Sequence, residues 1–152
     1  TMKFTGEFTI TAPRREVYEK LCDARFFASC VSGVEELTEI DPTHYTAVLA
    51  TKIAFVRFRF GITVELVEQS APSRVVAQAE GTPIGSAGRL TATSAADLRV
   101  EGDDTIVAYE IDLSLAGRLG SIGQPVLRSK AREMEKEFVR NLRAAFHTEE
   151  TS

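Results

Sequence analysis

Residues 125–146 read PVLRSKAREMEKEFVRNLRAAF, and their apolar side chains recur with the period of an α-helix. With spacings of three or four residues, a single apolar stripe comprises Leu127, Ala131, Met134, Phe138, Leu142 and Ala145. A helix of this length extends about 33 Å at about 1.5 Å per residue, which is enough to cross a β-sheet. We therefore predict one long amphipathic helix near the C-terminus, followed by a polar tail at residues 147–152.

The chain before this helix has the two-residue period of β-strands. The first strand is predicted over residues 3–11, and two short helices follow it, one beginning after Pro13 and one capped by Asp23. From residue 34 to residue 117, apolar and polar side chains alternate, and turn-forming sequences such as Glu101-Gly102-Asp103-Asp104 interrupt the pattern. This pattern predicts six further strands, which pair in antiparallel order because their connections are short.

These elements define an α+β fold with the helices on one face of a seven-stranded antiparallel sheet. We expect the sheet to curl around the C-terminal helix. Neither an internal repeat nor an interdomain linker interrupts residues 1–146, which are therefore predicted to form one domain. One helix cannot fill the concave face of such a sheet, so a ligand pocket is expected between the helix and the sheet.

Composition and charge exclude several functions. The chain has 152 residues, 43% of them apolar, and a net charge of −4, which is typical of a globular protein and disfavours binding to nucleic acid. No apolar run is long enough to span a bilayer and no signal sequence is recognised, so a cytoplasmic location is expected. Residues 125–146 are nevertheless basic. Their exposed face is either solvated or docks an acidic partner or anionic lipid headgroups through Arg132, Lys136 and Arg140.

Residue types that support catalysis or metal binding are scarce. His44 and His147 are far apart in the sequence, and neither has the spacing of a metal site. Cys22 and Cys30 are expected to be reduced thiols without a neighbouring base. We therefore predict no catalytic residue, no metal and no covalent cofactor.

Aromatic and aliphatic residues remain as the candidates for a binding site. Alanines and one serine, at positions 77, 79, 92, 94 and 96, recur on two neighbouring strands and would leave space opposite the helix. A buried Tyr109 hydroxyl would need a partner, which a ligand carbonyl, a water or a backbone group would supply. The predicted pocket is lined by Leu49, Phe58, Phe60, Ile62, Ala77, Leu90, Tyr109, Leu127, Met134 and Phe138.

Three segments carry a resemblance to a known family. Residues 2–10 (MKFTGEFTI), residues 30–37 (CVSGVEEL) and residues 117–119 (GRL) resemble the carbon monoxide dehydrogenase G-subunit family, a branch of the START-like, polyketide cyclase and Bet v 1-like superfamily. The resemblance extends over residues 3–146. The family usually has proline before Gly33 and cysteine or a small residue after it, whereas this chain has Ser32 and Val34, so a less rigid loop is expected here.

The resemblance implies a helix-grip fold around an apolar cavity. It also implies a non-enzymatic accessory protein of a molybdenum-containing carbon monoxide dehydrogenase, active in attaching that enzyme to the inner face of the cell membrane. A lipid or an isoprenoid quinone is the implied ligand. Two alternatives stay open: a small cyclase or dehydratase, for which Tyr109 is the one candidate acid or base, and a protein-interaction module that uses the basic helix face.

Overall fold

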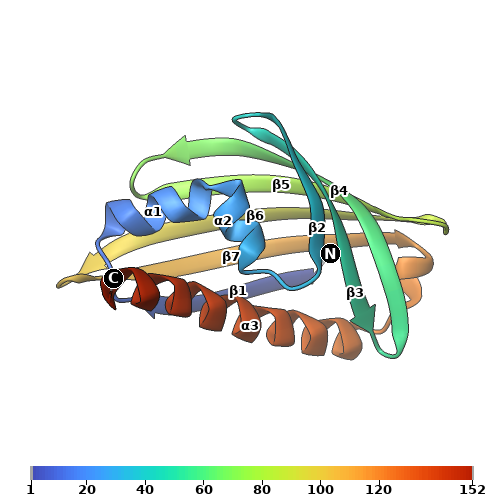
Figure 1. Ribbon diagram of the computed structural model, residues 1–152. Helices are drawn as coiled ribbons and strands as arrows, with labels where there is room; N and C mark the ends of the chain where they lie inside the picture. Colours follow the sequence, from blue (N-terminus) through green and yellow to red (C-terminus); the bar gives the residue numbers. More distant parts are fainter. Residues whose placement is uncertain (1, 152) are drawn as a thin grey trace.

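The computed structural model describes residues 2–151, apart from the side chains of residues 118 and 147–151. Seven antiparallel strands form one sheet, and three α-helices and one 3₁₀ helix complete the fold (Figure 1). The elements are, in order, β1 (Met2–Ile10), α1 (Arg14–Cys22), α2 (Ala24–Ser29), β2 (Val34–Asp41), β3 (His44–Ile53), β4 (Val56–Ser70), β5 (Arg74–Pro83), β6 (Gly88–Glu101), β7 (Asp104–Gly117), η1 (Arg118–Ser121) and α3 (Gln124–Thr151). The predicted fold class is confirmed.

The order of strands in the sheet follows from the short connections. Strands β2 to β7 each pair with the next strand along the chain, and β1 pairs with β7, which gives the order β1-β7-β6-β5-β4-β3-β2. The two helices between β1 and β2 provide the long connection that carries the chain from one edge of the sheet to the other. Consequently β1 and β2, which are neighbours in the sequence, lie at opposite edges.

The short helices begin where the sequence indicates. Pro13 is the residue before α1, where its missing N–H costs nothing. The Asp23 carboxylate caps α2 by accepting hydrogen bonds from the backbone N–H groups of Arg25 (3.1 Å) and Phe26 (3.2 Å). Both predicted helices are therefore present at the expected positions.

Helix α3 is longer than predicted. It continues through Thr151, so the expected end at Phe146 is wrong and the polar residues placed in a tail belong largely to the helix. No glycine or proline follows Phe146 in the sequence, so no residue there stops the helix. The helix packs against β1 at one edge of the sheet and against β3 near the other, so that it crosses the sheet (Figure 1).

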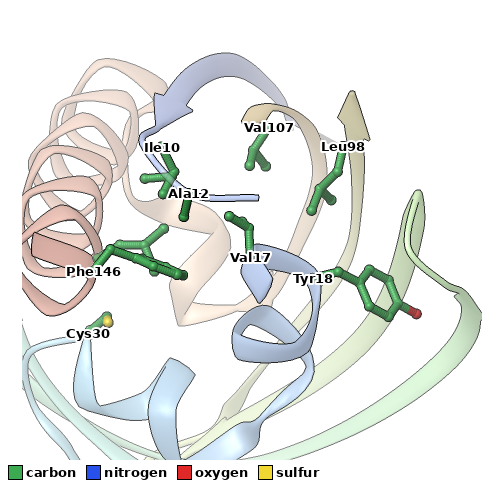
Figure 2. Close-up of a cluster of buried hydrophobic side chains, with 9 residues drawn as sticks. Ile10, Ala12, Val17, Tyr18, Cys30, Leu98, Val107 and Phe146 are labelled. Carbon is green, nitrogen blue, oxygen red and sulfur yellow. The ribbon is translucent and has the colours of Figure 1, made fainter. Parts of the chain in front are cut away.

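The buried core is concentrated at one end of the fold. Side chains from β1, α1, the end of α2, β6, β7 and the second half of α3 meet there (Figure 2). Within this core the fully buried Thr105 hydroxyl donates a hydrogen bond to the Ala12 carbonyl oxygen (2.8 Å). The members of the cluster are Ile10, Ala12, Val17, Tyr18, Cys30, Leu98, Val107, Leu142 and Phe146.

Candidate functional site: the inward face of the sheet

Aromatic contacts identify the face of the sheet that is turned toward α3. The ring of Phe8 lies 6.1 Å from the ring of Tyr109 and 6.5 Å from that of Phe138 on α3, measured between centroids. Paired residues in an antiparallel sheet point to the same face, so the strand register extends this assignment across the sheet. We call the resulting surface the inward face. Of the predicted pocket residues it contains Leu49, Phe58, Phe60, Ile62, Ala77, Leu90 and Tyr109.

The two ends of the inward face differ in burial. At the core end, Leu98 and Val107 are fully buried. Away from the core, most of the predicted pocket residues are only half-buried, and the two exceptions are Phe60 and Leu127. A close-packed interior would seal such apolar side chains from water. Helix α3 therefore covers this half of the inward face incompletely, and apolar surface remains accessible to solvent.

The total accessible surface agrees with this description. A compact protein of this mass is expected to expose about 7,600 Å². The chain exposes 8,932 Å². The chain therefore exposes roughly 1,300 Å² more surface than a compact protein of the same mass.

Small side chains form a continuous patch at the centre of the inward face. Ala77 of β5 pairs with Ser94 of β6, and Ala79 pairs with Ala92 in the next inward-facing position. All four residues are half-buried. Short side chains therefore fill little of the space between the sheet and α3 at the position of the predicted pocket.

One polar pair lies beside this apolar surface. The Tyr109 hydroxyl donates a hydrogen bond to the Glu135 carboxylate of α3. Burial, the hydrogen bond and the negative charge of Glu135 together raise the pKa of Tyr109 far above its ordinary value, so the hydroxyl stays protonated and remains a donor. The hydroxyl thus has a carboxylate partner, rather than the ligand carbonyl, water or backbone group expected from the sequence. Glu135 was missed because adjacent charged residues suggested a solvated helix face.

Gly6 creates the space for the Tyr109 ring. The two residues pair across β1 and β7, and a Cβ atom at position 6 would collide with the Tyr109 hydroxyl oxygen and the ring carbon that bears it. Position 6 in the segment MKFTGEFTI therefore requires glycine, because the Tyr109 ring lies directly over it.

Gly6→Ala should lower the free energy of unfolding by about 1–3 kcal/mol, because the added methyl group forces the Tyr109 ring away from Glu135. Chemical denaturation measures this cost. In a Tyr109→Ala background the atoms that collide are gone, so Gly6→Ala should then cost almost nothing. Equal costs in the two backgrounds would contradict the proposed contact.

Two surface pockets lie away from the inward face. One, of about 250 Å³, is lined by residues 22–25 together with Leu37, Glu39 and Tyr45. The other lies between residues 11–14 and the β6–β7 turn. Neither is lined by any of the ten predicted pocket residues.

The histidine and the cysteines with described side chains have ordinary environments. His44 is the first residue of β3, and its Nδ1 atom lies 2.8 Å from an Asp41 carboxylate oxygen; this hydrogen bond raises the pKa of His44 and lowers that of Asp41. Cys22 and Cys30 are free thiols, and burial raises the pKa of Cys30. Among the side chains that the structure describes, no group of three His, Cys, Asp or Glu residues is arranged to hold a metal ion.

The segment before β2 is fastened to both β3 and α3. The Ala50 N–H donates to the Gly33 carbonyl (2.9 Å), and Asn141 of α3 donates to the Cys30 carbonyl (3.0 Å). Ser32, at the position where the resemblance leads us to expect proline, donates to Glu137 of α3 (2.7 Å). Proline would restrict the backbone here but has no side-chain donor. Ser32 instead holds the loop through a side-chain hydrogen bond to the helix.

The predicted docking residues Arg132, Lys136 and Arg140 are exposed and lie on one side of α3, because they are spaced by four residues. None of the three forms an ion pair with another described side chain. Within the described residues, no helix is long and apolar enough to cross a bilayer.

The elements and their order define a START-like fold: an antiparallel sheet, a long C-terminal helix, and an apolar face between them. The chain belongs to the family of the G subunit of carbon monoxide dehydrogenase (CoxG), whose model matches residues 6–147. A search of curated proteins finds no match.

Solved structures share this fold. A conserved protein from Geobacillus kaustophilus is 22% identical, with a TM-score of 0.88 over 97% of this chain and 96% of that one. A START superfamily protein from Mycobacterium smegmatis is 9% identical, with a TM-score of 0.71 over 96% and 97%. The ZhuI aromatase/cyclase from Streptomyces sp. R1128 is 12% identical, with a TM-score of 0.68 over 95% and 92%.

Proposed function

We propose that the chain binds an apolar small molecule, a membrane lipid or an isoprenoid quinone, between the inward face and α3. The observation that carries the proposal is the half-buried apolar surface that α3 leaves accessible, centred on the small residues of β5 and β6. A ligand that removes about 200 Å² of such surface from water gains about 5 kcal/mol at about 25 cal/mol per Å². Exposure of this surface destabilises the free protein, and an apolar ligand relieves that cost.

The Tyr109–Glu135 pair would orient the ligand. An acceptor oxygen on the ligand, such as a quinone or ester carbonyl, would compete with Glu135 for the Tyr109 hydroxyl. A protonated donor beside an apolar surface supplies direction, while the surface supplies most of the affinity. This division suits a carrier better than an enzyme, because binding needs no proton transfer.

Membership in the CoxG family supports the cellular part of the proposal. According to this proposal, the chain is a non-enzymatic accessory protein of a carbon monoxide dehydrogenase-type molybdenum hydroxylase, located in the cytoplasm at the inner face of the cell membrane. The exposed basic residues Arg132, Lys136 and Arg140 would dock the partner enzyme.

Ala92→Phe tests the binding site directly. A phenylalanine at this inward position fills the space between β6 and α3, so the affinity for menaquinone-4 or for phosphatidylglycerol should fall at least about tenfold. Titration followed by native mass spectrometry measures the loss. Thr93→Phe is the matched control, because Thr93 is the next residue on β6 and points to the exposed outer face, where it should leave the affinity unchanged.

Two results would overturn the proposal. One is a wild-type protein that carries no lipid or quinone after purification and binds neither probe on titration. The other is unchanged affinity in Ala92→Phe, provided that thermal unfolding shows a folded variant.

A further inference from the structure

The turn between β3 and β4 has unusual residues for its conformation. Ala54 and Phe55 both adopt positive φ angles, +51° and +83°. Two-residue hairpin turns of this kind favour Asn-Gly, because a bulky side chain is disfavoured in the left-handed region. The Phe55 side chain is 93% exposed, and the Lys52 ammonium group lies 5.7 Å from its ring centre. Packing within the chain therefore does not compensate for the strained conformation.

Further apolar side chains are exposed at the same end of the sheet. Val56 begins β4, and Ile84, which is 55% exposed, lies in the β5–β6 loop, where its N–H donates to the Arg59 carbonyl of β4 (2.7 Å). Val126 is in the first turn of α3 and is also exposed. Figure 1 shows the β3–β4 turn, the β5–β6 loop and the beginning of α3 at one end of the molecule.

Charge is strongly segregated toward this end. Residues 50–62, 81–93 and 113–132, which include the three connections and their flanks, contain eight lysines and arginines and no acidic residue. The whole chain carries −4, so the remaining residues carry −12. The exposed apolar side chains therefore lie within the basic part of an acidic protein.

Phe55 lies between two cationic residues that have no carboxylate partner among the described side chains. Lys52 and Arg57 pair directly across the hairpin. Like charges at opposed positions repel each other, and neither residue forms an ion pair with a described carboxylate. The hairpin thus presents an aromatic ring between two cations, which fits a partner with an apolar phase beneath an anionic surface. An anionic lipid bilayer has both features.

We propose that residues 52–57 form a membrane-docking hairpin, in which Phe55 enters the interface of an anionic bilayer and Lys52 and Arg57 contact lipid phosphates. This inference rests on the membrane association within the proposed function and identifies the surface that carries it. Phe58 and Phe60 follow on the inward face, their stacked rings 5.6 Å apart between centroids. The docked hairpin therefore places the half-buried inward face next to the membrane from which an apolar ligand would enter.

The chain contains no tryptophan, so Phe55→Trp introduces a unique fluorescent reporter at the tip. With vesicles of phosphatidylglycerol and phosphatidylcholine, its emission should shift to the blue and be quenched by brominated acyl chains. Both effects should weaken as salt is added and disappear with pure phosphatidylcholine. Ile40→Trp is the matched control, because Ile40 is 65% exposed at the opposite, acidic end of the sheet and should show no shift.

A second variant separates docking from folding. Ala54→Asn/Phe55→Gly installs the residues that this turn favours, so the hairpin should remain intact, with an unchanged or higher Tm. Its co-sedimentation with anionic vesicles should nevertheless fall at least about tenfold, while its affinity for menaquinone-4 in detergent stays unchanged. Retained vesicle binding would overturn the docking hairpin, and so would binding to polyglutamate without binding to vesicles. If the wild-type protein did not bind menaquinone-4 in detergent, that result would instead contradict the proposed ligand site.

Discussion

Leu142→Ala is expected to lower the free energy of unfolding by about 2–5 kcal/mol, because it removes a fully buried leucine side chain from the main hydrophobic cluster. Leu142 is 0% exposed and, with Phe146, joins α3 to the cluster formed with β1, α1, β6 and β7. The cavity left behind cannot close, since neighbours from five elements hold one another in place. Urea denaturation measures the change.

Leu90→Ala is the matched control for this cost. Leu90 also faces inward from the sheet, but it is half-buried at the end that α3 leaves unsealed. The Leu90 side chain buries less apolar surface than the Leu142 side chain, so its removal is expected to cost about 1–2 kcal/mol. If the two substitutions cost the same, the core would extend evenly along the sheet, and the basis for a binding site at the open end would be lost.

Gly33→Ala is expected to cost about 2–4 kcal/mol for two separate reasons. Gly33 has φ +92°, which alanine adopts with difficulty, and its added Cβ atom would collide with the backbone oxygen of Ala50. The backbone must move to relieve this contact, and the Ala50 N–H bond to Gly33 would break with it. The loss of secondary structure with temperature, followed by circular dichroism, measures the effect.

Gly85→Ala isolates the conformational part of this cost. Gly85 has a similar φ of +86°, but no atom lies within 4 Å of the position that the added methyl group would take, so only the strain of the left-handed region remains. We expect about 1 kcal/mol. A cost at position 33 no greater than that at position 85 would mean that the contact with Ala50 relaxes freely.

The helices and strands could be predicted from local chemistry. Alternation from residue 34 to residue 117 identifies strands, and Asp23 and Pro13 mark helix starts, because these signals depend on neighbours within a few residues. The end of α3 could not be placed, since the polar residues after Phe146 neither favour nor stop a helix strongly. Its continuation to Thr151 is the main correction to the predicted elements.

The candidate site was only partly predictable. Which residues face inward follows from strand periodicity, and seven of the ten pocket candidates lie on the inward face of the sheet. The partner of Tyr109 did not follow from the sequence, because Glu135 belongs to a helix whose crossing angle and depth decide which of its side chains meets β7. The strained exposure of Phe55 was equally invisible, since φ angles are set by the hairpin register.

The sequence alone determined the strands, the amphipathic helix and the scarcity of histidine and cysteine, because each depends on residue type and short-range spacing. The tertiary structure decided where apolar side chains are sealed and where they stay accessible. That outcome depends on how one helix fits a curved sheet: α3 packs against the core at Leu142, whereas the small residues of β5 and β6 stay half-buried. Long-range packing of this kind fixes burial, and burial separates a structural core from a binding surface.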